Sequence, residues 1–223
     1  MAESTGTFRL LLVGGSGEVG RAVLAQALAD PRVGQVVALT RRPLAAEAKL
    51  TNLVVDFDAL PEAAPWWAVD AVVCTLGTTQ RAAGSKEKFA AVDRDLPLRI
   101  ARLARAAGAS RFALNSSLGA DARSGNFYLR TKGEAEDAIR QLGYPGFTIM
   151  RPSLIDADRA ESRPGERLAL TFARTLGPLI PRRWRAVTPV AIAHALLEAA
   201  LATPPVSRVI ESVDLQEPPF PRG

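Results

Sequence analysis

The sequence has only one cysteine and one histidine, Cys74 and His194. A lone cysteine excludes a disulfide within the chain, and two such residues are too few for the zinc or iron sites that proteins build from several Cys and His ligands. Cys74 ends the apolar run Ala71–Cys74, so we expect a small core residue and not a nucleophile. We predict no bound metal, and we assign no role to His194.

Long apolar runs and nucleic-acid motifs are also absent. No segment approaches the roughly 18 consecutive apolar residues of a transmembrane helix, and the polar lead before Phe8 lacks the features of a secretion signal. The net charge is only +5, and its one dense cluster is typical of a solvated loop. This cluster consists of Arg182, Arg183 and Arg185 around Trp184. We therefore expect a soluble cytoplasmic protein with no nucleic-acid or membrane partner.

Strand-like and helical segments alternate along the chain. Short apolar runs predict strands over residues 8–13, 35–40, 52–56, 69–75, 111–115, 147–150 and 208–213. Helical spacing of apolar residues predicts helices over 18–29, 86–107, 126–142, 168–176 and 189–201. This alternation is typical of a parallel sheet covered by helices on both faces. The sequence predicts an α/β fold with a doubly wound, mostly parallel sheet in a single domain, residues 1–223. Within it, residues 153–186 are the expected substrate lid.

A glycine-rich loop joins the first predicted strand to the first predicted helix. It reads Gly14-Gly15-Ser16-Gly17-Glu18-Val19-Gly20 and fits both Gly-x-Gly-x-x-Gly and Gly-x-x-Gly-x-x-Gly. Glycine permits a sharp turn and a close approach of backbone to a pyrophosphate, and the helix N-terminus offers free N–H groups to the anion. The alternative is a glycine-rich turn without a ligand. Between a strand and a helix, the loop predicts a Rossmann fold that binds a dinucleotide.

The end of the second predicted strand indicates which dinucleotide binds. NAD sites usually place Asp or Glu about 20 residues beyond the glycines to hold the ribose 2′-hydroxyl. Here the segment is Leu39-Thr40-Arg41-Arg42-Pro43, which has two guanidinium groups and no carboxylate. Because guanidinium groups pair well with phosphate, Thr40, Arg41 and Arg42 favour NADP over NAD. The alternative is that both arginines are solvated loop residues.

A tyrosine and a lysine have the spacing of a proton-transfer pair. Tyr128 and Lys132 stand four residues apart in the predicted helix 126–142, so their side chains share one face. A nearby ammonium group favours the phenolate form of a tyrosine, which makes Tyr128 a candidate general acid or base. Upstream, Ser116 and Ser117 end the fifth strand, where a hydroxyl can hydrogen-bond a substrate oxygen. The alternative for the serines is a plain turn.

Together these motifs resemble the short-chain dehydrogenase/reductase superfamily. Further stretches are similar to its atypical branch of Tat-interacting-oxidoreductase-like proteins, namely Cys74-Thr75-Leu76-Gly77-Thr78-Thr79, Val92-Asp93-Arg94-Asp95, Ser116-Ser117-Leu118-Gly119-Ala120-Asp121, Tyr128-Leu129-Arg130-Thr131-Lys132-Gly133-Glu134 and Glu161-Ser162-Arg163-Pro164-Gly165-Glu166. Arg151-Pro152-Ser153 after the sixth strand belongs to the same pattern.

The resemblance implies roles for particular residues. It places Leu76, Gly77 and Thr78 beside the cofactor, Asp56 and Phe57 near the adenine, and Pro152 and Ser153 near the nicotinamide. It also gives Lys132 a hydrogen bond to the nicotinamide ribose. The catalytic serine is Ser116 or Ser117, of which we prefer Ser117.

The motifs predict an NADP(H)-dependent oxidoreductase that transfers a hydride between the nicotinamide and a small carbonyl or alcohol, with Tyr128 as general acid/base. One alternative is a non-catalytic NADP(H)-binding regulator or redox sensor, which has no need of the Tyr–Lys pair. A sugar-nucleotide epimerase or dehydratase is disfavoured because fewer than about 75 residues follow Pro152. The helices 86–107 and 126–142 are able to pair across a two-fold axis, so we expect a monomer or a homodimer.

Overall fold

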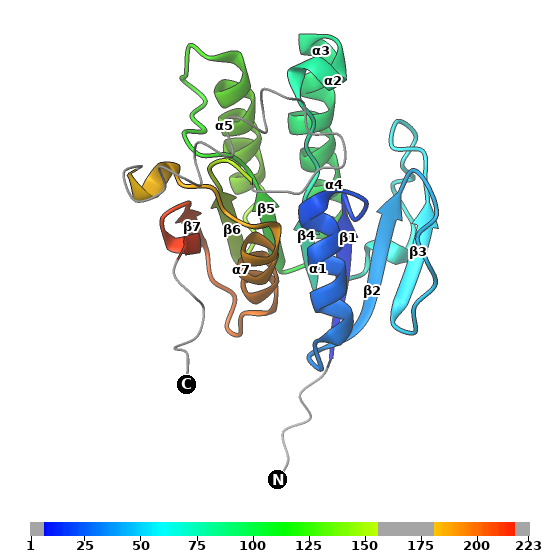
Figure 1. Cartoon of the computed structure of the whole chain (residues 1–223). Coiled ribbons are helices and arrows are strands. Elements are labelled where there is room, and N and C mark those ends of the chain that lie inside the picture. The colour runs from blue at the N-terminus through cyan, green and yellow to red at the C-terminus, as the bar shows by residue number, and fades with distance from the viewer. Residues whose placement is uncertain (1–6, 156–180, 217–223) are drawn as a thin grey trace, which may run out of the picture.

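The computed structural model describes residues 7–155 and 181–216. It contains a seven-stranded sheet in the order β3-β2-β1-β4-β5-β6-β7, and every neighbouring pair of strands is parallel (Figure 1). The strands are β1 (Phe8–Val13), β2 (Val33–Thr40), β3 (Leu50–Val54), β4 (Ala71–Cys74), β5 (Arg111–Asn115), β6 (Gly146–Arg151) and β7 (Arg208–Glu211). The doubly wound parallel sheet predicted from the sequence is confirmed.

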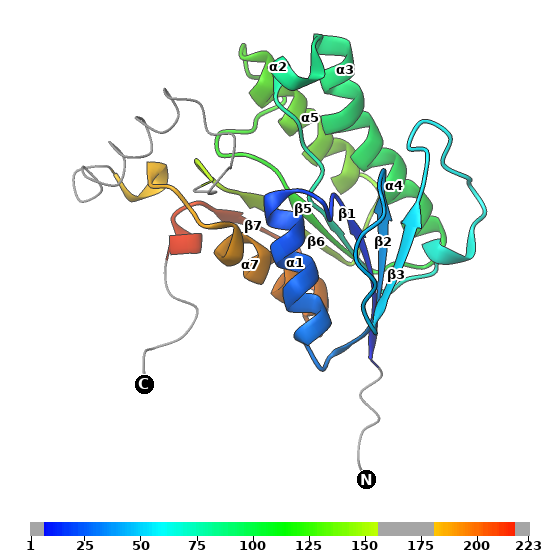
Figure 2. The same cartoon turned by 45° about the vertical axis from the view of Figure 1, so that its right-hand side comes forward.

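Helices cover both faces of this sheet, as Figure 2 shows. One face carries α1 (Glu18–Ala29) and α7 (Pro189–Leu201), and the other carries α4 (Leu96–Ala106) and α5 (Phe127–Arg140). The short helices α2 (Gln80–Ala83) and α3 (Lys86–Ala90) precede α4, and 3-10 turns span Pro65–Trp67, Arg182–Trp184 and Asp214–Gln216. A parallel sheet covered on both faces accounts for strand sequences that are almost entirely apolar.

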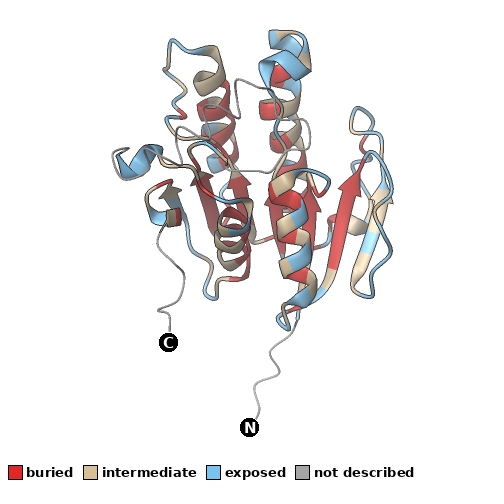
Figure 3. Ribbon diagram, in the orientation of Figure 1, coloured by how far each residue is buried: buried red, intermediate tan, exposed pale blue. Residues whose placement is uncertain are grey.

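Strand β1 shows how one apolar run serves both layers of the core. Leu10 and Leu12 pack toward α1 and α7, whereas Leu11 and Val13 pack toward α4 and α5. All four side chains are fully buried, like most of the central sheet in Figure 3. Cys74 is a buried core residue, as predicted, and lies on the α4 side. Burial raises the pKa of its thiol to about 11.

The helix predicted over 86–107 is confirmed as an unbroken helical segment from Lys86 to Ala106, but it contains a π-helical turn that was not predicted. Between α3 and α4 the chain makes a π-helical turn, Ala91–Asp95. Pro97 accounts for the π-helical turn, because a proline has no N–H to donate to the carbonyl of Asp93 four residues earlier. Instead, the N–H of Leu96 donates to the carbonyl of Ala91, five residues earlier, as in a π-helix.

The C-terminal part departs from the prediction at one boundary. The edge strand predicted over 208–213 is β7, and it ends at Glu211. There the N–H of Glu211 donates to the Asp214 carboxylate at 3.0 Å, which begins the final 3-10 turn. Of the expected lid, only residues 153–155 and 181–186 are described. The helix predicted over 168–176 lies outside the described residues.

The order of the strands reverses between β1 and β4, and this point positions the site. Val13 and Cys74 are paired there in register. After β1 the chain enters α1 on one face, and after β4 it continues toward α4 on the other. In open α/β sheets ligands bind outside the carboxyl ends of the strands at such a reversal. The glycine loop, the segment after β4 and the start of α5 all lie at this edge (Figure 1).

Candidate functional site

The glycine loop closes tightly against the start of α1. Gly14 has a φ of 90°, and a Cβ at Gly20 would lie 2.1 Å from the Gly14 carbonyl oxygen. Neither position accepts a side chain without movement of the backbone. Gly17 is the N-cap residue of α1 and supplies no side-chain hydrogen bond to the helix. The first N–H groups of α1 are therefore free of a side-chain cap, so the loop fits a pyrophosphate.

The other predicted residues of the loop divide between core and surface. Gly15 and Val19 are buried, whereas Ser16 is exposed. Glu18 is partly exposed and pairs with Arg21 one turn along α1. The loop thus presents backbone and small groups at its outer face, while its inner face anchors α1 to the sheet.

Asn52 on β3 holds the end of β2 in place. Its side-chain amide donates to the Thr40 hydroxyl at 2.8 Å and to the Ala38 carbonyl at 3.0 Å. Its oxygen accepts a hydrogen bond from the N–H of Leu44 at 2.7 Å. The loop between them carries the two predicted cofactor-binding arginines, Arg41 and Arg42, which are both exposed. Sequence reasoning missed Asn52, which looks like an ordinary polar residue of an edge strand.

Asp56 and Phe57 lie at the same edge of the sheet as Thr40, because Thr40 is paired with Val54 in the β2–β3 register. The Asp56 carboxylate accepts a hydrogen bond from the N–H of Asp58 at 2.9 Å. Phe57 packs against the core on the α4 side. The residues that the resemblance places near the adenine are therefore close to the predicted 2′-phosphate site.

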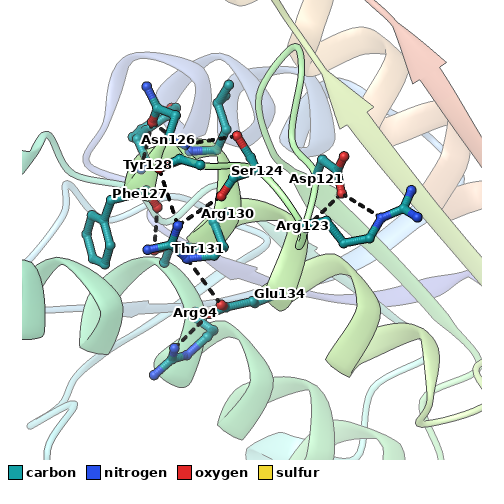
Figure 4. A network of polar contacts seen from close by, with 12 residues as sticks. Arg94, Asp121, Arg123, Ser124, Asn126, Phe127, Tyr128, Arg130, Thr131 and Glu134 are labelled. Carbon is teal, nitrogen blue, oxygen red and sulfur yellow. Dashed lines mark hydrogen bonds and ion pairs between the residues drawn. The ribbon is translucent and has the colours of Figure 1, made fainter.

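Helix α5 begins at this edge with a capped first turn that contains Tyr128. The Asn126 side-chain oxygen accepts hydrogen bonds from the N–H groups of Tyr128 at 2.9 Å and Leu129 at 3.3 Å (Figure 4). Such a cap stabilises the helix start. The Tyr128 ring packs against Phe89 of α3, with 5.5 Å between ring centroids, and remains partly exposed. Tyr128 is thus both anchored and accessible.

Lys132 follows Tyr128 by one turn and forms a buried ion pair. Its Nζ lies 2.7 Å from Asp93 Oδ1, and the two side chains are only 8% and 0% exposed. Asp93 Oδ2 also accepts a hydrogen bond from the N–H of Thr78 at 2.9 Å. Burial opposes the charge on the ammonium, but Asp93 and, more weakly, Tyr128 favour it, so the pKa of Lys132 is raised. Asp93 stands in the stretch Val92-Asp93-Arg94-Asp95, where its place in the sequence gives no sign of this contact with Lys132.

The two predicted serines have different surroundings. Ser116 is buried, and its hydroxyl donates to the Glu136 carboxylate. Glu136 also accepts from Arg151, whose Nε lies 3.1 Å from Oε1, and Arg151 reaches Glu211 of β7 at 3.2 Å. Because a carboxylate only accepts, the Ser116 proton is committed to it. Ser117 is partly exposed, and its hydroxyl has no hydrogen-bond partner among the described residues.

The residues after β6 connect the site to the C-terminal part. The Pro152 carbonyl accepts from the N–H of Leu118 at 2.9 Å, which ties the ends of β5 and β6 together. The Ser153 hydroxyl donates to the Arg185 carbonyl and accepts from the Ser212 hydroxyl at 2.9 Å. Ser153 therefore links the end of β6 to two C-terminal segments through Arg185 and Ser212. Its position near the nicotinamide stays a prediction.

Comparison with known proteins decides the family. Residues 14–182 match the family described as NAD(P)H-binding. The chain belongs to that family. It is similar to protein HTATIP2 of Rattus norvegicus, with 39% identity over 196 residues that cover 84% of this chain and 79% of the relative. It is also similar to the protein named fmp52, mitochondrial, of Emericella nidulans, with 40% identity over 175 residues, 74% of this chain and 75% of the relative. The predicted branch of the superfamily is confirmed.

Solved structures of the superfamily share the fold. MoeE5 in complex with UDP-glucose and NAD has a TM-score of 0.70 at 16% identity, covering 91% of this chain and 75% of that one. A short-chain dehydrogenase/reductase superfamily protein from Agrobacterium tumefaciens with bound NAD has a TM-score of 0.65 at 19% identity, covering 91% and 77%. At these identities the likeness shows the fold alone. The chain is an NAD(P)-binding Rossmann protein of the oxidoreductase-like family.

The comparisons leave the location of the protein as a prediction. None of the helices in the described ranges has the length and apolar character needed to cross a membrane. The fungal relatives carry the word mitochondrial in their names. The cytoplasmic location expected from the sequence is therefore not established by these relatives.

Proposed function

We propose that this chain is an NADP(H)-dependent oxidoreductase that reduces a small carbonyl compound or oxidises the matching alcohol. The observation that carries the proposal is the position of Tyr128, partly exposed and one helical turn from the buried ammonium of Lys132. Both lie at the carboxyl edge of the sheet, where the glycine loop also opens. When NADPH is bound, its nicotinamide supplies the hydride.

The residues of the chain handle the proton. In the reducing direction, the Tyr128 phenol donates its proton to the carbonyl oxygen as the hydride reaches the carbonyl carbon, and the phenolate then regains a proton from solvent. The Lys132 ammonium stabilises the negative charge on the phenolate. Ser117 donates a hydrogen bond to the same substrate oxygen. Ser116 is unsuited to this task because its proton is held by Glu136.

The preference for NADP is assigned to the loop after β2. Arg41 and Arg42 are exposed, and neither side chain has a partner among the described residues. Two guanidinium groups are thus available to the 2′-phosphate that distinguishes NADP from NAD. Asn52 fixes both ends of the loop, through Thr40 and Leu44, so the backbone that carries the arginines is held in place before the cofactor binds.

Replacement of the proposed proton donor tests the function. Tyr128→Phe should abolish NADPH-driven reduction across a panel of aldehydes and ketones, with a loss of about 10² to 10⁴ in rate. Its affinity for NADPH should stay within a factor of a few, because the glycine loop and the arginines hold the dinucleotide. The matched control is Tyr144→Phe, since Tyr144 is the second of the two tyrosines and its hydroxyl donates to the Ala101 carbonyl at 2.6 Å inside the core.

Two outcomes would contradict the proposal. A Tyr128→Phe protein that keeps full activity on a substrate of the wild type would remove Tyr128 from the mechanism. A wild-type protein that binds NADPH tightly and reduces nothing on the panel would make the chain a cofactor-binding regulator. Activity retained in Tyr144→Phe and lost in Tyr128→Phe is the expected result.

A further inference from the structure

A buried carboxylate joins the Tyr–Lys pair to the segment after β4. Asp93 stands in the π-helical turn Ala91–Asp95, and its side chain is fully buried. One oxygen pairs with Lys132 Nζ at 2.7 Å, and the other accepts from the Thr78 N–H at 2.9 Å. Gly77 lies directly alongside, where a Cβ would be 3.5 Å from the carboxylate and 3.6 Å from the ammonium. Asp93 therefore joins α5 to the Gly77–Thr78 segment after β4.

The groups around Lys132 show why its charge depends on this carboxylate. Asp93 faces it from the π-helical turn, Tyr128 from α5 and Cys74 from β4. Tyr128 contributes a phenol, and Cys74 contributes a thiol that stays protonated because burial raises its pKa to about 11. Among the described residues, Asp93 is thus the carboxylate that balances the ammonium. Without it, burial would drive the lysine toward its neutral form, which has no charge to stabilise a phenolate.

A second contact holds the turn from its outer side. Arg94 donates to Glu134 of α5 at 2.8 Å (Figure 4) and to the neighbouring Asp95 at 2.7 Å. The π-helical turn is therefore attached to α5 at two points, by a buried pair through Asp93 and by a half-exposed pair through Arg94. This double attachment sets the distance between Lys132 and the Gly77–Thr78 segment before any cofactor binds.

We propose that Asp93 is the positioning residue for Lys132, which it keeps charged and holds beside the Gly77–Thr78 segment. It acts through Lys132 and Thr78 and has no contact with the reacting atoms. Its effect on turnover rests on the proposed function, whereas the ion pair and its effect on the lysine do not. The two parts are therefore tested by separate measurements.

The charge of Lys132 is measurable because the chain has only four lysines, Lys49, Lys86, Lys88 and Lys132. In protein labelled with ¹³C,¹⁵N-lysine, the Lys132 side-chain NMR signal is the one missing from Lys132→Arg. We expect the wild-type signal to remain that of an ammonium at pH 10, below the ordinary lysine pKa of about 10.4. In Asp93→Asn, whose amide oxygen still suits the Thr78 N–H, the signal should titrate below the ordinary value.

The matched control is Asp95→Asn, which removes a carboxylate from the same turn but one that faces Arg94 at the surface. Lys132 should titrate in this variant as in the wild type. An Asp93→Asn protein with unchanged Lys132 titration would overturn the proposal. A wild-type Lys132 that is already neutral at pH 10 would do the same, and this measurement can overturn the proposal even if Asp93→Asn does not fold.

Measurements of cofactor binding and turnover test whether Asp93 positions Lys132. By fluorescence titration, Asp93→Asn should bind NADPH at least about tenfold more weakly than the wild type, since Lys132 loses the carboxylate that keeps it charged and holds it beside the Gly77–Thr78 segment. With an active substrate, its kcat should fall as pH rises, because the lysine loses its proton at a lower pH. A kcat–pH profile like that of the wild type would overturn the proposed positioning. Absence of turnover in the wild type would refute the proposed function and leave the NMR result to decide the ion pair.

Discussion

Two substitutions in the glycine loop, Gly20→Ala and Gly17→Ala, should separate folding from cofactor binding. A Cβ at Gly20 would lie 2.1 Å from the carbonyl oxygen of Gly14 and 2.7 Å from its carbonyl carbon. Both distances are far inside van der Waals contact, and both partners are backbone atoms, so α1 or the loop has to move. Overpacking of this kind typically lowers the free energy of unfolding by about 1–3 kcal/mol.

Gly17 offers the contrasting case. A Cβ there would lie 3.4 Å from the same oxygen, and the backbone angles, φ −78° and ψ 168°, are accessible to alanine. We expect the stability of Gly17→Ala to stay within about 1 kcal/mol of the wild type. The added methyl group would stand at the N-terminus of α1, where a pyrophosphate approaches the backbone. NADPH affinity should therefore fall at least about tenfold, or 1.4 kcal/mol.

Urea denaturation and calorimetric titration with NADPH measure the two effects. Gly125→Ala is the control, because nothing lies within 4 Å of a Cβ at that position, and it should change neither quantity. The reasoning is refuted if Gly17→Ala is destabilised as much as Gly20→Ala. It is equally refuted if Gly17→Ala binds NADPH as tightly as the wild type.

Three further predictions concern other parts of the site. In calorimetry the wild type should bind NADP at least about tenfold more tightly than NAD. The double variant Arg41→Ala/Arg42→Ala should lose most of that preference, with little change in its affinity for NAD. Equal affinities of the wild type for the two dinucleotides would refute the assignment. Glu136→Ala should lower the free energy of unfolding by about 3 kcal/mol, measured by urea denaturation, because Ser116 and Arg151 lose their shared carboxylate; a stability equal to that of the wild type would show that the carboxylate is dispensable. The Cys74 thiol should stay unreactive toward a disulfide reagent at pH 8 until the protein unfolds, since it is fully buried and its pKa is raised to about 11; rapid labelling of the folded protein would contradict this burial.

The order of the elements follows from local signals in the sequence. β1, α1, β5 and α7 begin and end at the residues that the apolar periodicity and the flanking Gly, Asn and Pro residues predict. The π-helical turn is missed although Pro97 is plain in the sequence, because the apolar spacing continues through it. A proline in the interior of a helix usually kinks or ends it, but here the helix continues through a π-helical turn, which only the backbone of the folded chain shows.

The partners of the candidate site residues depend on contacts between distant segments. Ser116 and Ser117 are equivalent as sequence, since both follow the same strand. They differ only because α5 packs with Glu136 against the first of them. In the same way, nothing near Lys132 in the sequence points to Asp93, which approaches from another helix. Motif spacing predicts which residues share the site. Tertiary packing decides which of their polar atoms already have a hydrogen-bond or ion-pair partner within the protein.

Arg151 connects the outermost strand of the sheet to the middle of the site. It pairs with Glu211 of β7 on one side and with Glu136 on the other, and Glu136 in turn holds the Ser116 hydroxyl. Shortening the protein before residue 208 would remove Glu211 and leave β6 as a bare edge. We expect Ser116 to shift as a result, although none of the deleted residues contacts it. A minimal version of this fold, built for engineering, therefore has to retain β7.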